Sequence, residues 1–111
     1  MVKIEQENGT LITKVEGRID GANAREFEDA VKSAIGESSH AVIMDLEDLA
    51  YISSAGLRVI LLTAKDLWKR DAKFALCSLP DPIREVVEIA GFDKIIQVYV
   101  SRAEALASLS G

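Results

Sequence analysis

The fold is decided by the stretch Tyr51-Ile52-Ser53-Ser54-Ala55-Gly56-Leu57, which lies between an apolar run and a long amphipathic segment. The run before it, residues 41–46, is apolar except for Asp45 and is typical of a buried strand. After it, apolar residues recur at the spacing of one helical face, namely Leu57, Ile60, Leu61, Ala64 and Leu67. The stretch therefore predicts a turn from a strand into a helix, with two adjacent serines at the start of the helix.

These two serines suit two different roles. Ser53 or Ser54 lies at or near the predicted helix N-cap, where a side-chain oxygen can accept a hydrogen bond from an unpaired backbone N–H. The same position faces the positive end of the helix dipole, which accommodates an added anion such as a phosphate group. The pattern by itself is compatible with a structural cap and with a phosphorylation site.

The rest of the chain alternates between predicted strands and helices. Residues 2–6 and 11–15 are predicted strands joined through Asn8-Gly9, a favoured hairpin turn. Further strands are predicted at residues 42–46, 73–77 and 95–100, and helices at residues 22–34, at residues 57–69, from Pro82 to Gly91, and after a capping box formed by Ser101 and Glu104. This order predicts an α/β fold, a mixed β-sheet of about four to five strands with helices packed against it.

Composition narrows the class of protein. The chain has 111 residues, of which 49% are hydrophobic, so we expect one packed domain spanning residues 1–111. Its formal charge is −5 and it has no basic run, which argues against a nucleic acid partner. Its apolar stretches are far shorter than the ~20 residues that cross a bilayer, so direct membrane insertion is not expected. A single cysteine excludes an intramolecular disulfide and agrees with a cytoplasmic protein.

Catalytic and metal chemistry have little support. His40 and Cys77 are the only histidine and the only cysteine, and no dense carboxylate cluster surrounds either of them in the sequence. A serine nucleophile elbow requires glycine two residues before the serine, where this chain has Ile52. The glycines do not form a phosphate-binding loop. We therefore expect no enzymatic activity, no metal and no cofactor.

Four segments, taken in order, resemble a known family. The pattern Asp45-Leu46-x-x-Leu49-x-Tyr51-Ile52-x-Ser54-x-Gly56-Leu57 resembles the signature of the STAS domain, the family of anti-sigma factor antagonists. Gly17-Arg18-Ile19-Asp20 is similar to the Gly-x-Leu-Asp of this family, Phe74-Ala75-Leu76-Cys77 is similar to its late strand, and residues 82–92 are similar to its proline-led helix and Gly-Phe/Leu pair. The resemblance covers nearly the whole chain and implies a STAS-like fold.

The resemblance also implies site residues. In regulatory members, the serine two residues before the glycine is phosphorylated by a partner kinase, and this position is Ser54. The residue before it is commonly Asp in the family but is Ser53 here, which leaves Ser53 as an alternative phosphoacceptor. The implied partner-binding residues are Asp20, Ser53, Ser54, Ala55, Gly56, Leu57 and Arg58. Asp20 can instead simply start the following helix, and Arg58 can instead be a solvated cation.

The resemblance finally implies a function. We expect an anti-sigma factor antagonist that acts by partner switching. In its unphosphorylated state it would bind a kinase-like anti-sigma factor, phosphorylation of Ser54 from Mg-ATP would release it, and a serine phosphatase would restore it. The alternative is a non-phosphorylated STAS interaction module of a transport or signalling assembly, in which Ser54 is just a helix cap and the binding surface is constitutive.

Overall fold

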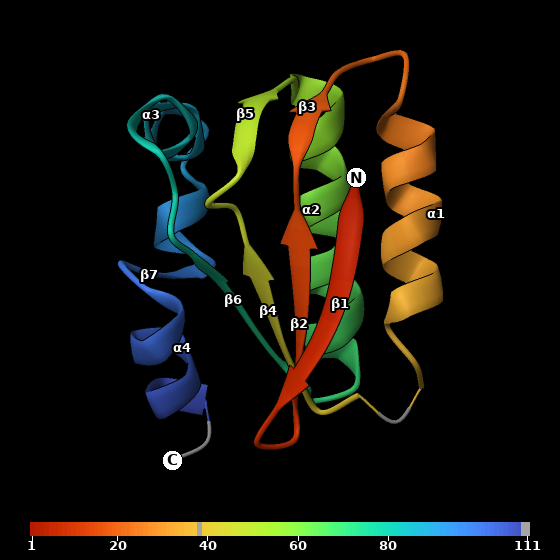
Figure 1. Ribbon diagram of the computed structural model, residues 1–111, viewed down its shortest axis with the longest axis vertical. Helices are drawn as coiled ribbons and strands as arrows, with labels where there is room; N and C mark the ends of the chain where they lie inside the picture. The colour runs from red at the N-terminus through yellow and green to blue at the C-terminus, as the bar shows by residue number, and fades with distance from the viewer. Residues whose placement is uncertain (38, 110–111) are drawn as a thin grey trace.

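The computed structural model describes residues 1–37 and 39–109, and its centre is a mixed β-sheet (Figure 1). The main sheet has the strand order β1-β2-β4-β6-β7, and a second, two-stranded sheet pairs β3 with β5. The strands are β1 (Val2–Glu7), β2 (Thr10–Val15), β3 (Gly17–Ile19), β4 (Ala41–Asp45), β5 (Leu49–Ile52), β6 (Lys73–Cys77) and β7 (Gln97–Tyr99). Only β1 and β2 pair in antiparallel orientation, and the other pairs are parallel. The predicted α/β fold with a mixed sheet is confirmed.

The helices cover the two faces of the sheet unequally. They are α1 (Ala24–Ala34), α2 (Ser54–Lys69), α3 (Asp81–Ile89) and α4 (Arg102–Leu109), with a short 3-10 helix, η1 (Phe92–Lys94). Helices α1 and α2 pack on one face, while α4 packs on the opposite face against β4, β6 and β7 (Figure 1). Helix α3 contacts β5 near one end of the sheet. None of the described helices is long and apolar enough to span a membrane.

The strands divide their side chains between two apolar clusters because neighbouring residues of a strand point to opposite faces. In β4, Val42 and Met44 enter the main core beneath α1 and α2, whereas Ile43 enters a second cluster beneath α4. Cys77 belongs to the second cluster and is fully buried, as its apolar strand indicated. The main core is the larger of the two and holds the elements that carry the two serines.

Several strand and helix boundaries agree with the prediction because they have local sequence signals. Asn8 and Gly9 both have positive φ angles, 52° and 79°, which suit the tight turn between β1 and β2. Strand β6 has the predicted bounds, Pro82 lies in the first turn of α3, and Gly91 follows that helix in the left-handed conformation with φ 78°. The hydroxyl of Ser101 accepts a hydrogen bond from the backbone N–H of Glu104 at 3.1 Å, so α4 begins as the capping box predicted.

Other boundaries differ from the prediction for identifiable reasons. Helix α1 begins at Ala24 rather than at residue 22, because the backbone N–H groups of Ala22 and Asn23 are hydrogen-bonded to the side chain of Asp20. Strand β7 is shorter than residues 95–100, because the N–H groups of Ile95 and Ile96 donate back to the carbonyl of Phe92. Helix α2 begins three residues earlier than the predicted residue 57, and β3, β5 and η1 were not predicted as separate elements.

Candidate functional site

The two-stranded sheet brings Asp20 next to the serines. Strands β3 and β5 are parallel, with Ile19 opposite Ile52, so both strands end at the same edge. The backbone N–H of Ser53 donates to the carbonyl of Ile19 at 2.8 Å, which joins the two strand ends directly. Asp20 and Ser53 therefore follow neighbouring strand ends, and the start of α2 lies there too (Figure 1).

The structure separates the roles of the two serines. Ser53 is the N-cap of α2: its backbone is extended, and its Oγ accepts a hydrogen bond from the N–H of Gly56 at 3.3 Å. Its carbonyl accepts the first helical hydrogen bond, from Leu57 at 3.0 Å. Ser54 is the first helical residue, is exposed, and makes no side-chain hydrogen bond to any described residue. The cap is thus Ser53, and the hydroxyl of Ser54 is uncommitted.

This separation predicts unequal costs for the two alanine substitutions. Ser53→Ala removes the oxygen that pairs with the N–H of Gly56, so we expect it to lower the free energy of unfolding by about 1 kcal/mol. Ser54→Ala removes no intramolecular contact and should change it by less than about 0.5 kcal/mol. Urea denaturation of both variants measures the difference. Equal losses would show that Ser54 shares the capping role.

Gly56 permits the first turn of α2 to lie directly against β3 and β5. A Cβ atom at this position would lie 2.7 Å from Cγ2 of Ile19 and 2.7 Å from Cγ1 of Ile52. Both isoleucines are buried, so neither side chain has free space into which it can move. The glycine of the Ser-x-Gly motif is therefore required for packing. It lets the helix start that carries Ser54 lie close to the two strands.

Asp20 starts the segment that leads into α1. Its Oδ1 accepts hydrogen bonds from the N–H groups of Ala22 at 2.9 Å and Asn23 at 3.2 Å. The side chain of Asn23 accepts a hydrogen bond from the N–H of Asp20 at 2.8 Å and donates one to the carbonyl of Arg18 at 2.8 Å. The helix-starting role weighed from the sequence is thus present, and Asp20 is held rigidly beside Ser53.

A wide, shallow groove of about 520 Å³ begins at Ser54. It is lined by Ser54, Ala55, Leu57, Arg58 and Leu61 of α2 and by Ala90 and Phe92 beyond α3. Its walls are mostly apolar, and the adjoining Ile89 is 85% exposed. The sequence reasoning assigned no role to Phe92 or Ala90. The sequence feature that could have identified these two residues is the Gly-Phe pair of residues 91–92. It resembles the family pattern but lies far from Ser54 in the sequence.

Two arginines frame this edge. Arg58 is exposed, lines the groove, and has no ion pair within the part of the chain that the structure describes. Arg18 stacks on Tyr51, with its guanidinium carbon 4.5 Å from the ring centroid, and joins the exposed sides of β3 and β5. The first turn of α2 contains no acidic residue that would offset the positive end of the helix dipole.

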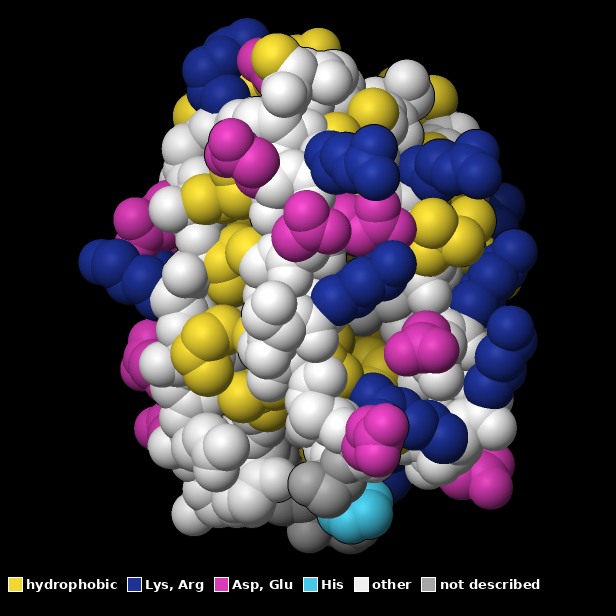
Figure 2. Space-filling model, turned by 90° about the vertical axis from the view of Figure 1, so that its right-hand side faces the viewer, with side chains coloured by type: hydrophobic (Ala, Val, Ile, Leu, Met, Phe, Trp, Pro, Cys, Tyr) yellow, Lys and Arg dark blue, Asp and Glu magenta, His cyan; other side chains and the backbone are white. Residues whose placement is uncertain are grey.

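Charges elsewhere are mixed in sign. Figure 2 shows the face that carries α1, where acidic, basic and apolar side chains are interleaved in the middle and basic side chains gather along the right-hand side. Lys32 and Glu28 of α1 form one of the ion pairs, at 3.4 Å.

The single histidine of the chain lies away from Ser54. His40 lies just before β4, and its carbonyl accepts a hydrogen bond from the N–H of Lys73 at the start of β6. Figure 1 places that end of the sheet opposite the start of α2. Over residues 1–37 and 39–109, no group of three or more His, Cys, Asp or Glu side chains is arranged to hold a metal ion.

Two proteins with similar sequences have related descriptions. BtrV of Bordetella bronchiseptica, described as a candidate anti-sigma factor antagonist, is 40% identical over 105 residues, which are 95% of this chain and 90% of BtrV. RsfB of Mycobacterium tuberculosis, an anti-sigma-F factor antagonist, is 23% identical over 110 residues, which are 99% of this chain and 89% of RsfB.

Solved structures share the fold. An anti-sigma factor antagonist from Mycobacterium paratuberculosis matches with a TM-score of 0.91 and 24% identity, covering 100% of this chain and 94% of that chain. The phosphorylated form of SpoIIAA from Bacillus matches with a TM-score of 0.72 and 17% identity, covering 97% of this chain and 98% of that chain. The profile of the STAS domain matches residues 1–105. The chain therefore belongs to the STAS domain family, in which its relative RsfB is an anti-sigma-F factor antagonist.

Proposed function

We propose that this chain is an anti-sigma factor antagonist that acts by partner switching, with Ser54 as the phosphoacceptor. Unphosphorylated, it binds a kinase-like anti-sigma factor through the groove that begins at Ser54. Phosphorylation of Ser54 by that partner, from Mg-ATP, breaks the complex, and a serine phosphatase restores it. The observation that carries the proposal is the exposed, uncommitted hydroxyl of Ser54 at a helix start beside an apolar groove.

The geometry favours Ser54 over Ser53 as the acceptor. A kinase needs a hydroxyl that can leave its present contacts and enter the active site of the kinase. Ser53 is half-buried and its Oγ accepts a hydrogen bond from the N–H of Gly56, so this hydroxyl would have to leave that contact before it could enter a kinase active site. Ser54 is exposed, and phosphorylation there breaks no hydrogen bond to a described residue.

The same geometry allows phosphorylation without unfolding. A phosphate adds roughly −1.5 to −2 charges at neutral pH. At Ser54 these charges lie at the positive end of the α2 dipole, where an anion is stabilising. The effect of the modification therefore falls on the interface. The relatives support this scheme, because RsfB is named for antagonism of an anti-sigma factor and SpoIIAA has a phosphorylated form.

The partner-binding surface in this proposal combines the implied residues with those that the fold adds. Asp20, Ser53, Ser54, Ala55, Gly56, Leu57 and Arg58 lie at or beside the start of α2, and Leu61, Ala90 and Phe92 extend the surface along the groove. The polar edge contains Asp20 and Arg58, and the centre is apolar. Such a centre suits an apolar contact of the partner, surrounded by charged contacts.

Phosphate mapping tests the proposal. The chain is incubated with the kinase-like anti-sigma factor of the same genome and Mg-ATP, and the product is digested and examined by mass spectrometry. We expect one phosphate, on Ser54, which Ser53→Ala retains and Ser54→Ala abolishes. Stable binding without any phosphate transfer would favour the non-phosphorylated interaction module. A phosphate on Ser53 in the wild type would assign the acceptor to the other serine.

A further inference from the structure

The face of the sheet opposite α1 and α2 has a small apolar cluster under the C-terminal helix. Strand residues Ile12, Ile43, Ala75 and Cys77 are fully buried there. Within the described residues, the helix that packs over them is α4, which has only eight residues (Figure 1). Removing α4 would therefore expose an apolar strip across β2, β4 and β6 while leaving the main core covered.

Few apolar contacts hold α4 in place. Its buried side chains are Ala105 and Leu109, with Leu106 partly buried against the same cluster. An isolated helix of this length is not stable in water, so α4 depends on its contacts with the sheet. Since the apolar part of those contacts is small, the polar contacts at its two ends carry much of the attachment.

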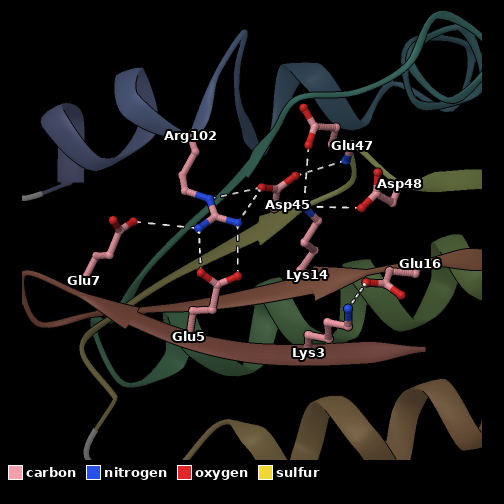
Figure 3. A network of polar contacts seen from close by, with 9 residues as sticks. All are labelled: Lys3, Glu5, Glu7, Lys14, Glu16, Asp45, Glu47, Asp48 and Arg102. Atoms are coloured by element: carbon pink, nitrogen blue, oxygen red, sulfur yellow. Dashed lines mark hydrogen bonds and ion pairs between the residues drawn. The ribbon is translucent and has the colours of Figure 1, made fainter.

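Arg102 forms the polar contact at the start of α4 (Figure 3). Its Nε and one terminal nitrogen lie 3.1 Å and 3.0 Å from Oδ2 of Asp45, at the end of β4. Its terminal nitrogens also lie 3.0 Å and 3.4 Å from the two carboxylate oxygens of Glu5 in β1, with Glu7 at 3.8 Å. We call these four residues the Arg102 clamp. It joins the start of α4 to two strands, and the hydrogen bond from Arg102 lowers the pKa of Glu5.

Asp45 depends on this clamp. Its side chain is only 4% exposed, and its other oxygen accepts a hydrogen bond from the N–H of Glu47 at 3.0 Å. At the far end of α4, Lys73 donates to the carbonyl of Leu109 at 3.2 Å, and the hydroxyls of Tyr99 and Ser108 pair. Among the described residues these are two single hydrogen bonds, one of them between exposed side chains, whereas the clamp is multidentate and charged.

We propose that α4 is a detachable cover, which opens as a unit while the rest of the domain stays folded, and that the Arg102 clamp sets how often it opens. Opening breaks the contacts of Arg102 with Asp45 and Glu5, lets water reach Asp45, and uncovers the apolar strip. The main core beneath α1 and α2 has no part in the motion. The proposal is independent of phosphorylation at Ser54.

Cys77 is a built-in reporter for this motion. It is the only cysteine of the chain, is fully buried beneath α4, and belongs to the uncovered strip. Burial raises the pKa of its thiol to about 11, so it is unreactive while α4 is closed. Reaction of Cys77 with a thiol reagent therefore requires opening of α4 or unfolding of the whole domain, and the two routes differ in their dependence on urea.

The test is the rate of reaction of Cys77 with an aromatic disulfide reagent, measured over a range of urea concentrations below the unfolding transition. We expect Cys77 of the wild type to react faster than it would if only globally unfolded molecules reacted. Its reaction rate should also depend on urea much more weakly than global unfolding does. Arg102→Gln should raise the rate about ten-fold or more, and Arg102→Lys, which keeps the charge but loses the planar fork, should raise it less.

The matched control is Lys3→Gln, which removes an exposed ion pair to Glu16 at 3.1 Å without touching α4, and should leave the rate within about two-fold.

Two results would overturn the proposal. The first is a wild-type reaction rate that gives the same opening free energy and the same urea dependence as global unfolding. It would show that α4 leaves the sheet only when the domain unfolds. This result needs no variant, so it stands even if Arg102→Gln does not fold. A rate for Arg102→Gln equal to that of Lys3→Gln would show that the clamp does not control opening.

Discussion

Ser54→Asp is expected to bind the kinase-like anti-sigma factor at least about 100-fold more weakly than wild type. The side chain at this position projects from the start of α2 into a groove whose walls include Leu57, Leu61 and Phe92. A partner seated in the groove removes water from the carboxylate, and this desolvation is costly even though Arg58 lines the same groove, because the attraction of an ion pair often does not repay it. If the net cost is about 3 kcal/mol, the dissociation constant rises by roughly two orders of magnitude. Isothermal titration calorimetry of both proteins against the same partner measures this change.

The same substitution should leave the fold intact. Aspartate in the first turn of α2 lies at the positive end of the helix dipole, which favours it by about 0.3–1 kcal/mol. Ser53 remains as the cap, and Ser54 has no hydrogen bond to a described residue that the substitution could break. We therefore expect the melting temperature to stay the same or to rise slightly. A fall in binding without a fall in stability separates an interface effect from unfolding.

Ser54→Asn is the matched control, since it has nearly the size of aspartate and carries no charge. We expect it to weaken binding by much less than Ser54→Asp, and Ser54→Ala to bind as wild type does. If asparagine and aspartate weaken binding equally, the loss is steric and the electrostatic part of the proposal fails. If none of the three affects affinity, the groove at Ser54 is not the partner surface.

Much of the fold could be predicted because the main elements have local signals. Strand β6 is an apolar run whose bounds were predicted correctly, and the hairpin of β1 and β2 follows from Asn8-Gly9. The amphipathic spacing of α2 predicted its buried face, with Ile60, Ala64 and Leu67 all fully buried. In each case the information lies within a few residues of the element.

The second sheet could not be predicted because its signals are long-range. Strands β3 and β5 have three and four residues, and their ladder is irregular between Gly17 and Arg18. Such short strands exist because they pair with each other and because α2 packs on them through Gly56. Neither condition can be recognised from the few residues around each strand.

In the candidate site, too, the features with local signals could be predicted and those that depend on long-range contacts could not. The serines and Gly56 were found because they form one continuous motif at a strand-to-helix turn. The separation of Ser53 as cap from Ser54 as free hydroxyl needed the backbone of the turn, since either serine suits a cap. Phe92 and Ala90 lie more than thirty positions further along the chain, and only the packing of α3 beside β5 brings them to the groove.

Gly56→Ala is expected to destabilise the domain by about 1–2 kcal/mol, although alanine is the better helix former. Alanine gains at most about 1 kcal/mol in a helix relative to glycine. Against this, overpacking of a close-packed site costs about 1–3 kcal/mol. The added Cβ would lie 2.7 Å from atoms of Ile19 and Ile52, so α2 or the two strands must shift. These atoms belong to β-branched side chains with restricted rotamers, which makes local relief difficult. Urea denaturation measures the loss.

Gly21→Ala tests whether the loss at Gly56 comes from packing or from the change of residue type. Gly21 is close to the same edge of the sheet, but no heavy atom of the described residues lies within 4 Å of its added Cβ, and its φ angle is not in the left-handed region. There the substitution should be neutral or slightly stabilising, because alanine lowers the entropy of the unfolded chain. A shift of α2 or of the two strands changes the position of Ser54 relative to the edge of the sheet, so Gly56→Ala should also weaken partner binding, and Gly21→Ala should not. If Gly56→Ala is as stable as Gly21→Ala and binds as wild type does, the contact of α2 with β3 and β5 does not determine the position of Ser54.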